Sequence, residues 1–414
     1  MDEVATANSL RDPLDGIAVV VPRGATIGPL LEAPASLPFS PPILSFVENL
    51  GRALRSDPAV RRHPELVALG FWARAANIRR LKARFEAPYP EAVRLPRGVA
   101  FHIAPSNVDT IFVYSLLLSM LAGNVNLVRV SSRASDQANI LMEVFAKTLE
   151  TADPAVRNST VIVRYEHDRA ITDALSRVAD LRIVWGGDAT VQLVRESQLA
   201  PAATELVFPN KYSLAVIDAA AWLAAPDQAA VAGAFVNDSL WFGQAACSSP
   251  RTVVWRGSDL DFTAASKSFW QAIEEGAEAA GFEMEDAHAV AKLLAEQGAA
   301  IDESIAIRPS LTNRVRVLDC ELAHLVQTPG VGNGYFRETR IDRLGQLTGL
   351  AQPNWQTIVS FGVPDSDWRA TLAVNPLARG IDRIVRVGTA LNFDAIWDGK
   401  DLLSAMSRLV VIAL

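Results

Sequence analysis

The sequence has 414 residues, of which half are hydrophobic and 21% are charged, and 39 Lys and Arg against 46 Asp and Glu give a net charge of −7. At roughly 150 residues per domain, this length predicts about two to three globular domains with cores of their own. The composition excludes intrinsic disorder, collagen-like repeats and small disulfide scaffolds. The acidic balance argues against a nucleic-acid partner, because binding to a phosphate backbone needs a basic field.

Two cysteines, Cys247 and Cys320, are too few for a disulfide framework and favour a reducing compartment. The N-terminal residues 1–4 are acidic where a secretory signal is basic, so we expect a cytoplasmic protein. The longest apolar run, residues 111–122, falls short of the ~20 residues of a membrane span and predicts a buried core helix instead. The five histidines lack metal-ligand spacing, so we expect no metal site.

From residue 98 the chain alternates β-rich runs with helical stretches, which is typical of βαβ units in a doubly wound parallel sheet. The expected strands are residues 98–104, 126–130, 161–164, 181–185 and 205–208. The expected crossover helices are residues 108–122, 134–149, 170–178 and 190–197. The first half of the chain therefore predicts a Rossmann-type domain.

After residue 210 a second α/β series begins. Its expected strands are residues 213–217, 252–255, 314–318 and 357–361, and its expected helices are residues 262–280 and 287–297. We expect the tail, residues 383–387 and 391–397, to form a strand that pairs elsewhere or with a partner subunit. The backbone N–H and C=O groups of an unpaired strand edge favour such pairing. The resulting division is a leading arm with helices over 1–95, a nucleotide-type domain over 96–210, a second domain over 211–380 and a C-terminal strand region over 381–414.

Cys247 lies among small residues in the run 242–251, directly before an expected strand, and small neighbours leave room for a substrate. A thiolate attacks a carbonyl carbon well and also leaves well, so a thioester on Cys247 would divide acyl transfer into two easier steps. A buried structural cysteine is the alternative. Cys320 ends an expected strand, where a small core hydrophobe is typical.

Two glycines, Gly186 and Gly187, separate an expected strand from a helix and would let a pyrophosphate approach the helix N-terminus beside Asp188. Asp188 as a simple N-cap is the competing interpretation. The Gly330-x-Gly332-x-Gly334 run has neither the spacing nor the context of a dinucleotide-binding turn and is interpreted as an ordinary loop.

Other candidates follow strand ends, where open α/β sheets bind ligands. Pro105, Ser106 and Asn107 come after the first strand, and Asn107 is either an oxyanion donor or a helix cap. At the end of the second strand, where an acidic residue would bind a ribose 2′-hydroxyl, the chain has residues that favour a 2′-phosphate instead. These residues are Arg129, Ser131, Ser132 and Arg133.

Asn107, the run 123–129, Gly186-Gly187 and Gln244 ahead of Cys247 occur in the order typical of the aldehyde dehydrogenase superfamily. Within it, residues 244–250 and the tail over 380–385, 393–394 and 397–399 make the chain resemble the acyl-CoA reductase (LuxC) family, over roughly residues 95–410. The resemblance implies an aldehyde dehydrogenase-like α/β fold, with a Rossmann-type cofactor domain, an α/β catalytic domain and a terminal strand for homo-oligomerisation.

The resemblance further implies NADPH-dependent reduction of a fatty acyl thioester to an aldehyde, with Cys247 as acyl acceptor. Asn107 and the backbone N–H of Cys247 would hold the oxyanion, while Gly186 and Gly187 would lie against the cofactor pyrophosphate. Arg129 and Ser132 would lie near the adenosine ribose. The donor would be acyl-CoA or an acyl-protein, and an acyl-protein synthetase or acyltransferase is an expected partner.

Two departures from the superfamily bear on the reaction. The hydrolytic glutamate is replaced by Val207, which leaves Glu205, out of register, as the nearby base. The glutamate that steadies the nicotinamide ribose is not evident around residues 352–355. Rival interpretations are NAD(P)-dependent aldehyde oxidation, to acid or to acyl-CoA, and a non-catalytic cofactor-binding subunit of an acyl-transfer complex.

Overall fold

The structure, a computed structural model, describes residues 17–105, 111–131, 135–166, 168–301, 305–307, 312–322, 325, 331–375 and 378–413. The chain forms two compact units. The first runs to Pro209 and also takes in the segment from Asp394 onward, and the second is Asn210–Phe393. No helix within these described ranges combines the length and the apolar character that crossing a membrane requires.

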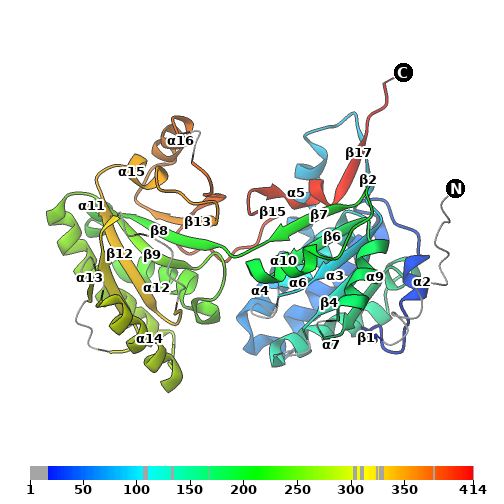
Figure 1. The fold of residues 1–414 in the computed structure, drawn as a ribbon, viewed down its shortest axis with the longest axis horizontal. Coiled ribbons are helices and arrows are strands. Elements are labelled where there is room, and N and C mark those ends of the chain that lie inside the picture. The colour runs from blue at the N-terminus through cyan, green and yellow to red at the C-terminus, as the bar shows by residue number, and fades with distance from the viewer. Residues whose placement is uncertain are drawn as a thin grey trace. The chain divides into compact units, whose positions relative to one another are not determined.

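The first unit is built on a six-stranded sheet (Figure 1). In sheet order its strands are β1 (Ala18–Val21), β5 (Thr160–Arg164), β4 (Val125–Val130), β3 (Val99–Ile103), β6 (Leu181–Trp185) and β7 (Thr204–Phe208). β1 is antiparallel to β5, and the other pairs are parallel. β6 is buried along its whole length, which is typical of a parallel strand covered on both faces.

Helices cover both faces of this sheet. On one face, Val125 and Leu127 of β4 share an apolar core with α2 (Gly28–Leu31), α9 (Arg169–Val178) and α10 (Asp188–Arg195). α6 (Ile111–Leu121) packs against β3 and β4, and its apolar side chains are buried all round, which confirms the predicted core helix. Among the described residues before 160, the unit's other helices are α3 (Pro41–Ser56), η1 (Val60–Arg62), α4 (Pro64–Trp72), α5 (Ala75–Glu86), α7 (Asp136–Glu150) and α8 (Pro154–Arg157).

The C-terminal segment completes the first unit. β17 (Ser407–Val410) pairs antiparallel with β2 (Val93–Pro96), and β15 (Ile396–Trp397) pairs with β16 (Lys400–Asp401), which is followed by α17 (Leu402–Ala405). The expected strand over 391–397 is thus reduced to its last two residues. Because the terminal strand β17 pairs with β2 of the same chain, it is no argument for a homo-oligomer. Homo-oligomerisation therefore stays a prediction.

The second unit contains a seven-stranded sheet. In sheet order the strands are β10 (Ile305–Ile307), β11 (Arg316–Cys320), β12 (Tyr335–Ile341), β9 (Pro250–Arg256), β8 (Tyr212–Asp218), β13 (Trp355–Phe361) and β14 (Arg383–Arg386). Only the β10–β11 pair among these described strands is antiparallel. β14, the first part of the tail expected to pair elsewhere or with a partner subunit, is parallel to β13 in the same sheet.

Two apolar clusters enclose this second sheet. On one face, Phe235 of α12 (Gln228–Ser239) and Phe269 of α13 (Asp259–Ala279) pack with Trp222 of α11 (Ala219–Leu223). On the other face, the core includes Leu347 of α15 (Leu344–Thr348) and Trp368 of α16 (Asp365–Ala373). The described helices of this unit also include α14 (Asp286–Ala299) and the short η2 (Trp241–Gln244).

Candidate active site

Cys247 lies in the second unit, between η2 and β9. Three consecutive residues ahead of it have left-handed backbones, with φ of 56° at Phe242, 59° at Gly243 and 64° at Gln244. Such a run is costly for residues with a Cβ, so the surrounding contacts must hold it. The turn places Cys247 beside the amino ends of parallel strands, rather than at the carboxyl ends where open sheets usually carry ligands.

The fully buried side chain of Gln244 fixes this turn. Its Nε2 donates to the carbonyl of Pro250 at 3.0 Å, and its Oε1 accepts from the backbone N–H groups of Gly334 at 3.0 Å and Tyr335 at 3.2 Å. The N–H of Asn333 donates to the carbonyl of Gly243 at 2.9 Å. Residues 332–335 therefore brace the cysteine turn, so their interpretation as an ordinary loop missed a supporting role.

Cys247 itself is partly exposed and makes contacts with residues of β8 and β13. Ser213 of β8 donates its hydroxyl to the Cys247 carbonyl at 2.6 Å. Gln356 of β13 donates from Nε2 to the Cys247 Sγ at 3.2 Å. Neither Ser213 nor Gln356 was expected from the sequence, because a polar residue inside an apolar strand gives no signal of what it faces.

Cys320 provides the contrast within the same unit. It is 8% exposed at the end of β11, and its Sγ donates to the Glu338 carbonyl at 3.4 Å. Burial raises the pKa of this thiol to about 11. The expectation that Cys320 is a core residue is confirmed, and its thiol is a poor nucleophile near neutral pH.

The predicted cofactor residues that the structure describes lie on the first unit, at one edge of its sheet. Pro105 follows β3, while Arg129 and Ser131 lie at the end of β4, and Gly186 follows β6. These three strands are neighbours and run parallel, and the chain departs from β3 in both directions, so this edge is a topological switch point. Ser106, Asn107, Ser132 and Arg133 lie outside the described residues.

The turn between β6 and α10 is tight. Gly187 is the N-cap of α10, and the exposed Asp188 stands in its first turn, so the interpretation of Asp188 as the N-cap is wrong. A Cβ on Gly186 would come within 2.9 Å of the Thr190 Cγ2, so glycine there permits close packing of strand and helix. The helix N-terminus suits an anion, whereas the Asp188 carboxylate opposes one.

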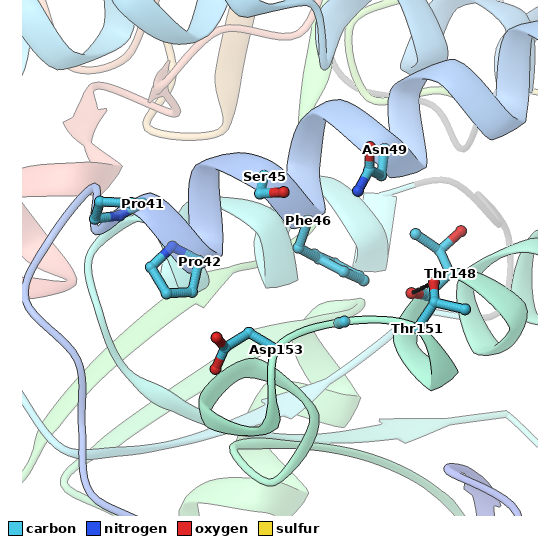
Figure 2. A pocket seen from close by; sticks show the side chains of 9 residues that line it. Pro41, Pro42, Ser45, Phe46, Asn49, Thr148, Thr151 and Asp153 are labelled. Atoms are coloured by element: carbon cyan, nitrogen blue, oxygen red, sulfur yellow. Dashed lines mark hydrogen bonds between the residues drawn. The ribbon is translucent and has the colours of Figure 1, made fainter.

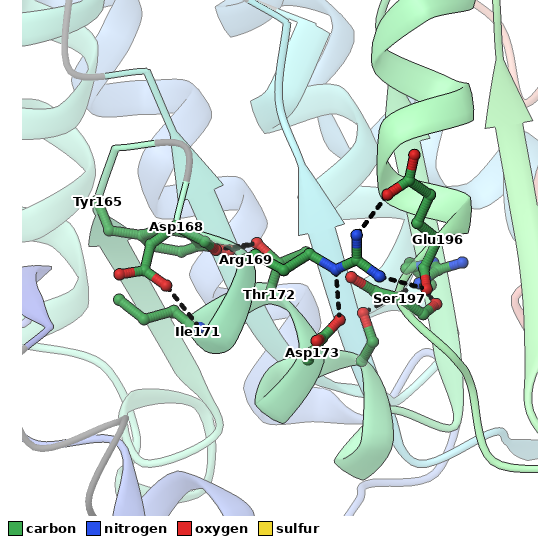
Figure 3. A network of polar contacts seen from close by, with 10 residues as sticks. Tyr165, Asp168, Arg169, Ile171, Thr172, Asp173, Glu196 and Ser197 are labelled. Carbon is green, nitrogen blue, oxygen red and sulfur yellow. Dashed lines mark hydrogen bonds and ion pairs between the residues drawn. The ribbon is translucent and has the colours of Figure 1, made fainter.

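Arg129 is held at the end of β4 by Tyr165. Its Nη2 donates to the Tyr165 carbonyl at 3.2 Å, and the guanidinium carbon lies 5.5 Å from the centre of the Tyr165 ring. The Tyr165 hydroxyl in turn lies 3.4 Å from the Thr172 Oγ1 on α9 (Figure 3). Fixing the backbone and ring beside Arg129 limits where this guanidinium can reach.

The same network joins α9 to the end of α10. Asp168 caps α9 through the Ile171 N–H at 3.1 Å, and Arg169 donates to the Asp173 carboxylate at 3.3 Å and forms an ion pair with Glu196 (Figure 3). The two helices next to the candidate cofactor edge are thus cross-linked. The Arg169–Glu196 pair lies at the C-terminal end of α10 and is exposed, so it adds little stability by itself.

Glu205 is the base expected near the position where Val207 replaces the hydrolytic glutamate, and it forms ion pairs with two arginines of the first unit. Its Oε1 lies 2.6 Å from the Arg182 Nη2, and its Oε2 lies 2.8 Å from the Arg195 Nε. Arg182 is 3% exposed, so this is a largely buried pair. Both oxygens of the Glu205 carboxylate are therefore engaged by guanidinium groups.

A pocket of about 250 Å³ opens in the first unit between α3 and the end of α7 (Figure 2). It is lined by Pro41, Pro42, Ser45, Phe46, Asn49, Thr148, Thr151, Ala152 and Asp153. This lining includes no thiol and none of the residues predicted to bind cofactor. We therefore assign it no part in the candidate active site.

Residues 84–409 match the sequence family described as acyl-CoA reductase (LuxC). A long-chain acyl-protein thioester reductase of Aliivibrio fischeri is 30% identical over 168 residues, which is 40% of this chain and 33% of that protein. A long-chain acyl-protein thioester reductase 2 of Photobacterium leiognathi is 27% identical over 169 residues. The match to each of these two relatives spans only about a third of the relative's length.

Solved structures share the fold. Lactaldehyde dehydrogenase from Escherichia coli superposes with a TM-score of 0.60 at 13% identity, over 93% of this chain and 87% of that one. Betaine aldehyde dehydrogenase from Staphylococcus aureus, solved in complex with NAD+, gives 0.58 at 14% identity, over 89% and 81%. The chain therefore has the expected aldehyde dehydrogenase-like α/β fold.

Proposed function

We propose that this chain, which belongs to the acyl-CoA reductase (LuxC) family, reduces a fatty acyl thioester to an aldehyde through an acyl intermediate on Cys247. The observation that carries the proposal is the setting of Cys247. It is a partly exposed thiol on a turn that Gln244 and residues 332–335 hold in a left-handed conformation. A nucleophile fixed in place loses little orientational entropy on attack.

The first half of the reaction is acyl transfer. The Cys247 thiolate attacks the carbonyl carbon of the donor, a new C–S bond forms, and the donor's C–S bond breaks to release its thiolate. The Ser213 hydroxyl holds the Cys247 carbonyl, which keeps the sulfur in one position during this exchange. The resemblance to the family implies that Asn107 and the Cys247 N–H would donate to the oxygen as it becomes negative.

The second half reduces the acyl-enzyme. Bound NADPH would supply the hydride that reduces the thioester carbon. The carbonyl oxygen takes up a proton to give a thiohemiacetal on Cys247. Its collapse releases the hydroxyl proton to solvent, re-forms the carbonyl and breaks the C–S bond, which returns the electron pair to the Cys247 sulfur and frees the aldehyde. Hydrolysis of the acyl-enzyme would compete with this step. Two features support slow hydrolysis: Val207 stands in place of the hydrolytic glutamate, and Glu205 is paired with Arg182 and Arg195.

The residues at the candidate cofactor edge fit a nicotinamide dinucleotide. The N-terminus of α10 after Gly186-Gly187 would take the pyrophosphate, and Pro105 would line the same switch point. Arg129 and Ser131, at the position where an acidic residue would bind a 2′-hydroxyl, support a 2′-phosphate and hence NADPH. Asp188 would stay outside the phosphate contact. Ser106, Ser132 and Arg133 belong to the same proposed site.

The acyl donor is either a coenzyme A ester or an acyl-protein. The family description names the first and the curated relatives name the second. An acyl-protein donor would bring with it a synthetase or acyltransferase partner. Both donors deliver the same thioester carbonyl to Cys247, so the chemistry proposed here is shared.

NADPH oxidation measured with saturating cofactor tests the proposal, using acyl-CoA esters of increasing length and an acylated carrier protein in parallel. Cys247→Ala is expected to abolish aldehyde formation, while Cys320→Ala, the matched change at the buried thiol, keeps it. Full turnover by Cys247→Ala would refute the mechanism. Aldehyde oxidation with no reduction of either donor would favour the oxidative alternative.

A further inference from the structure

A bulge in β13 lies against the cysteine turn. Trp355 pairs with Tyr212 and Ile358 pairs with Leu214. Between these two pairs, β13 has two residues, Gln356 and Thr357, whereas β8 has only Ser213. Bulges of this kind re-aim side chains and are frequent beside active sites. Both Gln356 and Thr357 are 1% exposed, so their polar groups must find partners in the protein.

The hydrogen bonds around Gln356 fix which end of its amide meets the sulfur. Arg383 donates from Nε to the Thr357 Oγ1 at 2.9 Å, and a guanidinium can only donate. The Thr357 hydroxyl therefore directs its own hydrogen elsewhere, to the Gln356 Oε1 at 3.2 Å. With its oxygen held by Thr357, the amide presents its NH₂ group to the Cys247 Sγ at 3.2 Å.

The far end of this donor chain, Arg383 to Thr357 to Gln356, is also anchored. Arg383 donates from Nη1 to the Asn392 carbonyl at 3.1 Å and bonds through Nη2 to the Ala390 carbonyl. Asp238 of α12 accepts from the N–H groups of Gly388 at 2.6 Å and Ala390 at 2.8 Å. The turn that holds Arg383 is thus held in place by a buried carboxylate.

We propose that Gln356 is a catalytic residue whose amide stabilises the Cys247 thiolate, and that Thr357 and Arg383 are positioning residues that keep the amide donor turned toward the sulfur. This inference rests on the proposed function of Cys247 as the acyl acceptor. An NH₂ donor favours the thiolate over the thiol, because only the thiolate is a strong acceptor.

The donor acts at two points of the cycle. Before acyl transfer it raises the fraction of Cys247 present as thiolate. At the collapse of the thiohemiacetal it stabilises the sulfur as the C–S bond breaks, so the same contact assists attack and departure. Charged residues of the neighbouring strands include Arg251 on β9 and Arg383 on β14. Lys211 and Asp382, which directly precede β8 and β14, form an ion pair with Nζ and Oδ2 2.7 Å apart.

The test is the pH profile of alkylation of Cys247 by iodoacetamide in the full chain, with the adduct located by mass spectrometry. Gln356→Met keeps the length of the side chain and removes the donor. We expect its alkylation midpoint to rise by about 1 to 2 pH units, the value of a hydrogen bond to a charged group. Gln356→Glu places an acceptor at the sulfur and is expected to raise the midpoint further.

Thr357→Val leaves Gln356 in place but removes the hydroxyl that orients it, so a smaller upward shift is expected. The matched control is Gln352→Glu, at an exposed position whose Nε2 donates to the Leu350 carbonyl, where the profile is expected to stay as in the unmodified protein. Unchanged midpoints in both Gln356 variants overturn the proposal. An equal shift in Gln352→Glu overturns it as well, because charge alone would then account for the effect.

The readout separates this inference from the proposed function. A shifted alkylation profile in a chain that reduces no thioester would leave the Gln356 contact standing and remove the reductase. Thioester reduction with an alkylation profile insensitive to Gln356 would leave the reductase standing and remove the proposed role of Gln356. Folding of each variant is checked by its thermal unfolding midpoint before alkylation.

Discussion

The hydroxyl of Ser213 donates to the carbonyl of Cys247 across 2.6 Å and accepts from the N–H of Thr357 at 3.2 Å. One side chain on β8 thus connects the turn that carries the nucleophile with the bulge that carries Gln356. The position of Cys247 is set by β8 and β13 as well as by its own turn.

Ser213→Ala should lower kcat/KM for thioester reduction by roughly 10-fold or more, because the Cys247 carbonyl and the Thr357 N–H lose their shared partner. The free energy of unfolding should fall by about 1–3 kcal/mol, the cost of leaving buried polar groups unpaired. Urea unfolding and steady-state kinetics measure the two effects. Unchanged kinetics would show that the carbonyl contact does not position the sulfur.

Gly332→Ala should disturb the cysteine turn. Gly332 has φ of 75°, and an added Cβ would lie 2.6 Å from the Gly243 carbonyl oxygen, which is backbone and cannot turn aside. We expect loss of most Cys247 alkylation and aldehyde formation. Gly298→Ala is the matched control, since nothing lies within 4 Å of its added Cβ, and alanine in α14 should stabilise the helix by up to ~1 kcal/mol. Equal activity of the two variants would contradict this account.

Arg129→Ala should weaken NADPH far more than NADH, by about 10-fold or more in the ratio of their dissociation constants, if the guanidinium binds the 2′-phosphate. A purely structural effect through Tyr165 would weaken both cofactors alike. Lys147→Ala removes the same charge from an exposed residue of α7 paired with Glu143, and should change neither constant. Titration of cofactor fluorescence measures the ratio, and an unchanged ratio for Arg129→Ala rejects the assignment.

His102 makes the stability of the first unit depend on pH. Burial lowers its pKa from 6.5 to about 4, and its ring lies between the Ser115 hydroxyl and the Asn126 amide oxygen. The unfolded chain therefore binds more protons than the folded chain between pH 6.5 and 4. The contribution of His102 to the free energy of unfolding therefore decreases as pH falls across that window, by about 3 kcal/mol.

The measurement for His102 is the free energy of unfolding from pH 8 to pH 4, in the unmodified protein and in His102→Gln. The variant should lose stability at pH 8, where the neutral ring packs best, and show a shallower decline below pH 6.5. A decline as steep as in the unmodified protein would place its origin at other groups.

The sequence predicted the regular α/β parts of the fold well and the site in part. Strands such as β6 are mostly apolar, with Arg182 as the one charged residue, and are bounded by turn residues, so their position is readable from one chain. β12 was not predicted, because Arg337, Glu338 and Arg340 interrupt its apolar pattern. The buried Glu338 accepts from the indoles of Trp255 and Trp270, partners that lie 83 and 68 residues away along the chain.

The same limit applies to the candidate site. Cys247 is conspicuous in sequence because it is a thiol among small residues. Gln356 and Ser213 gain their significance from a strand bulge, and Gly332 from the left-handed turn that it packs against. Bulges and long-range backbone contacts leave no local pattern, so these residues were accessible only from the three-dimensional structure.

The most direct test of the central claim is to incubate the full chain with a long-chain acyl-CoA or an acylated carrier protein in the absence of cofactor, and to follow intact mass. We expect one added acyl group, located on the peptide containing Cys247, which is released as an equal amount of aldehyde when NADPH is added. An adduct on Cys320, or an adduct on Cys247 that NADPH leaves in place, would contradict the role of Cys247 as the acyl acceptor.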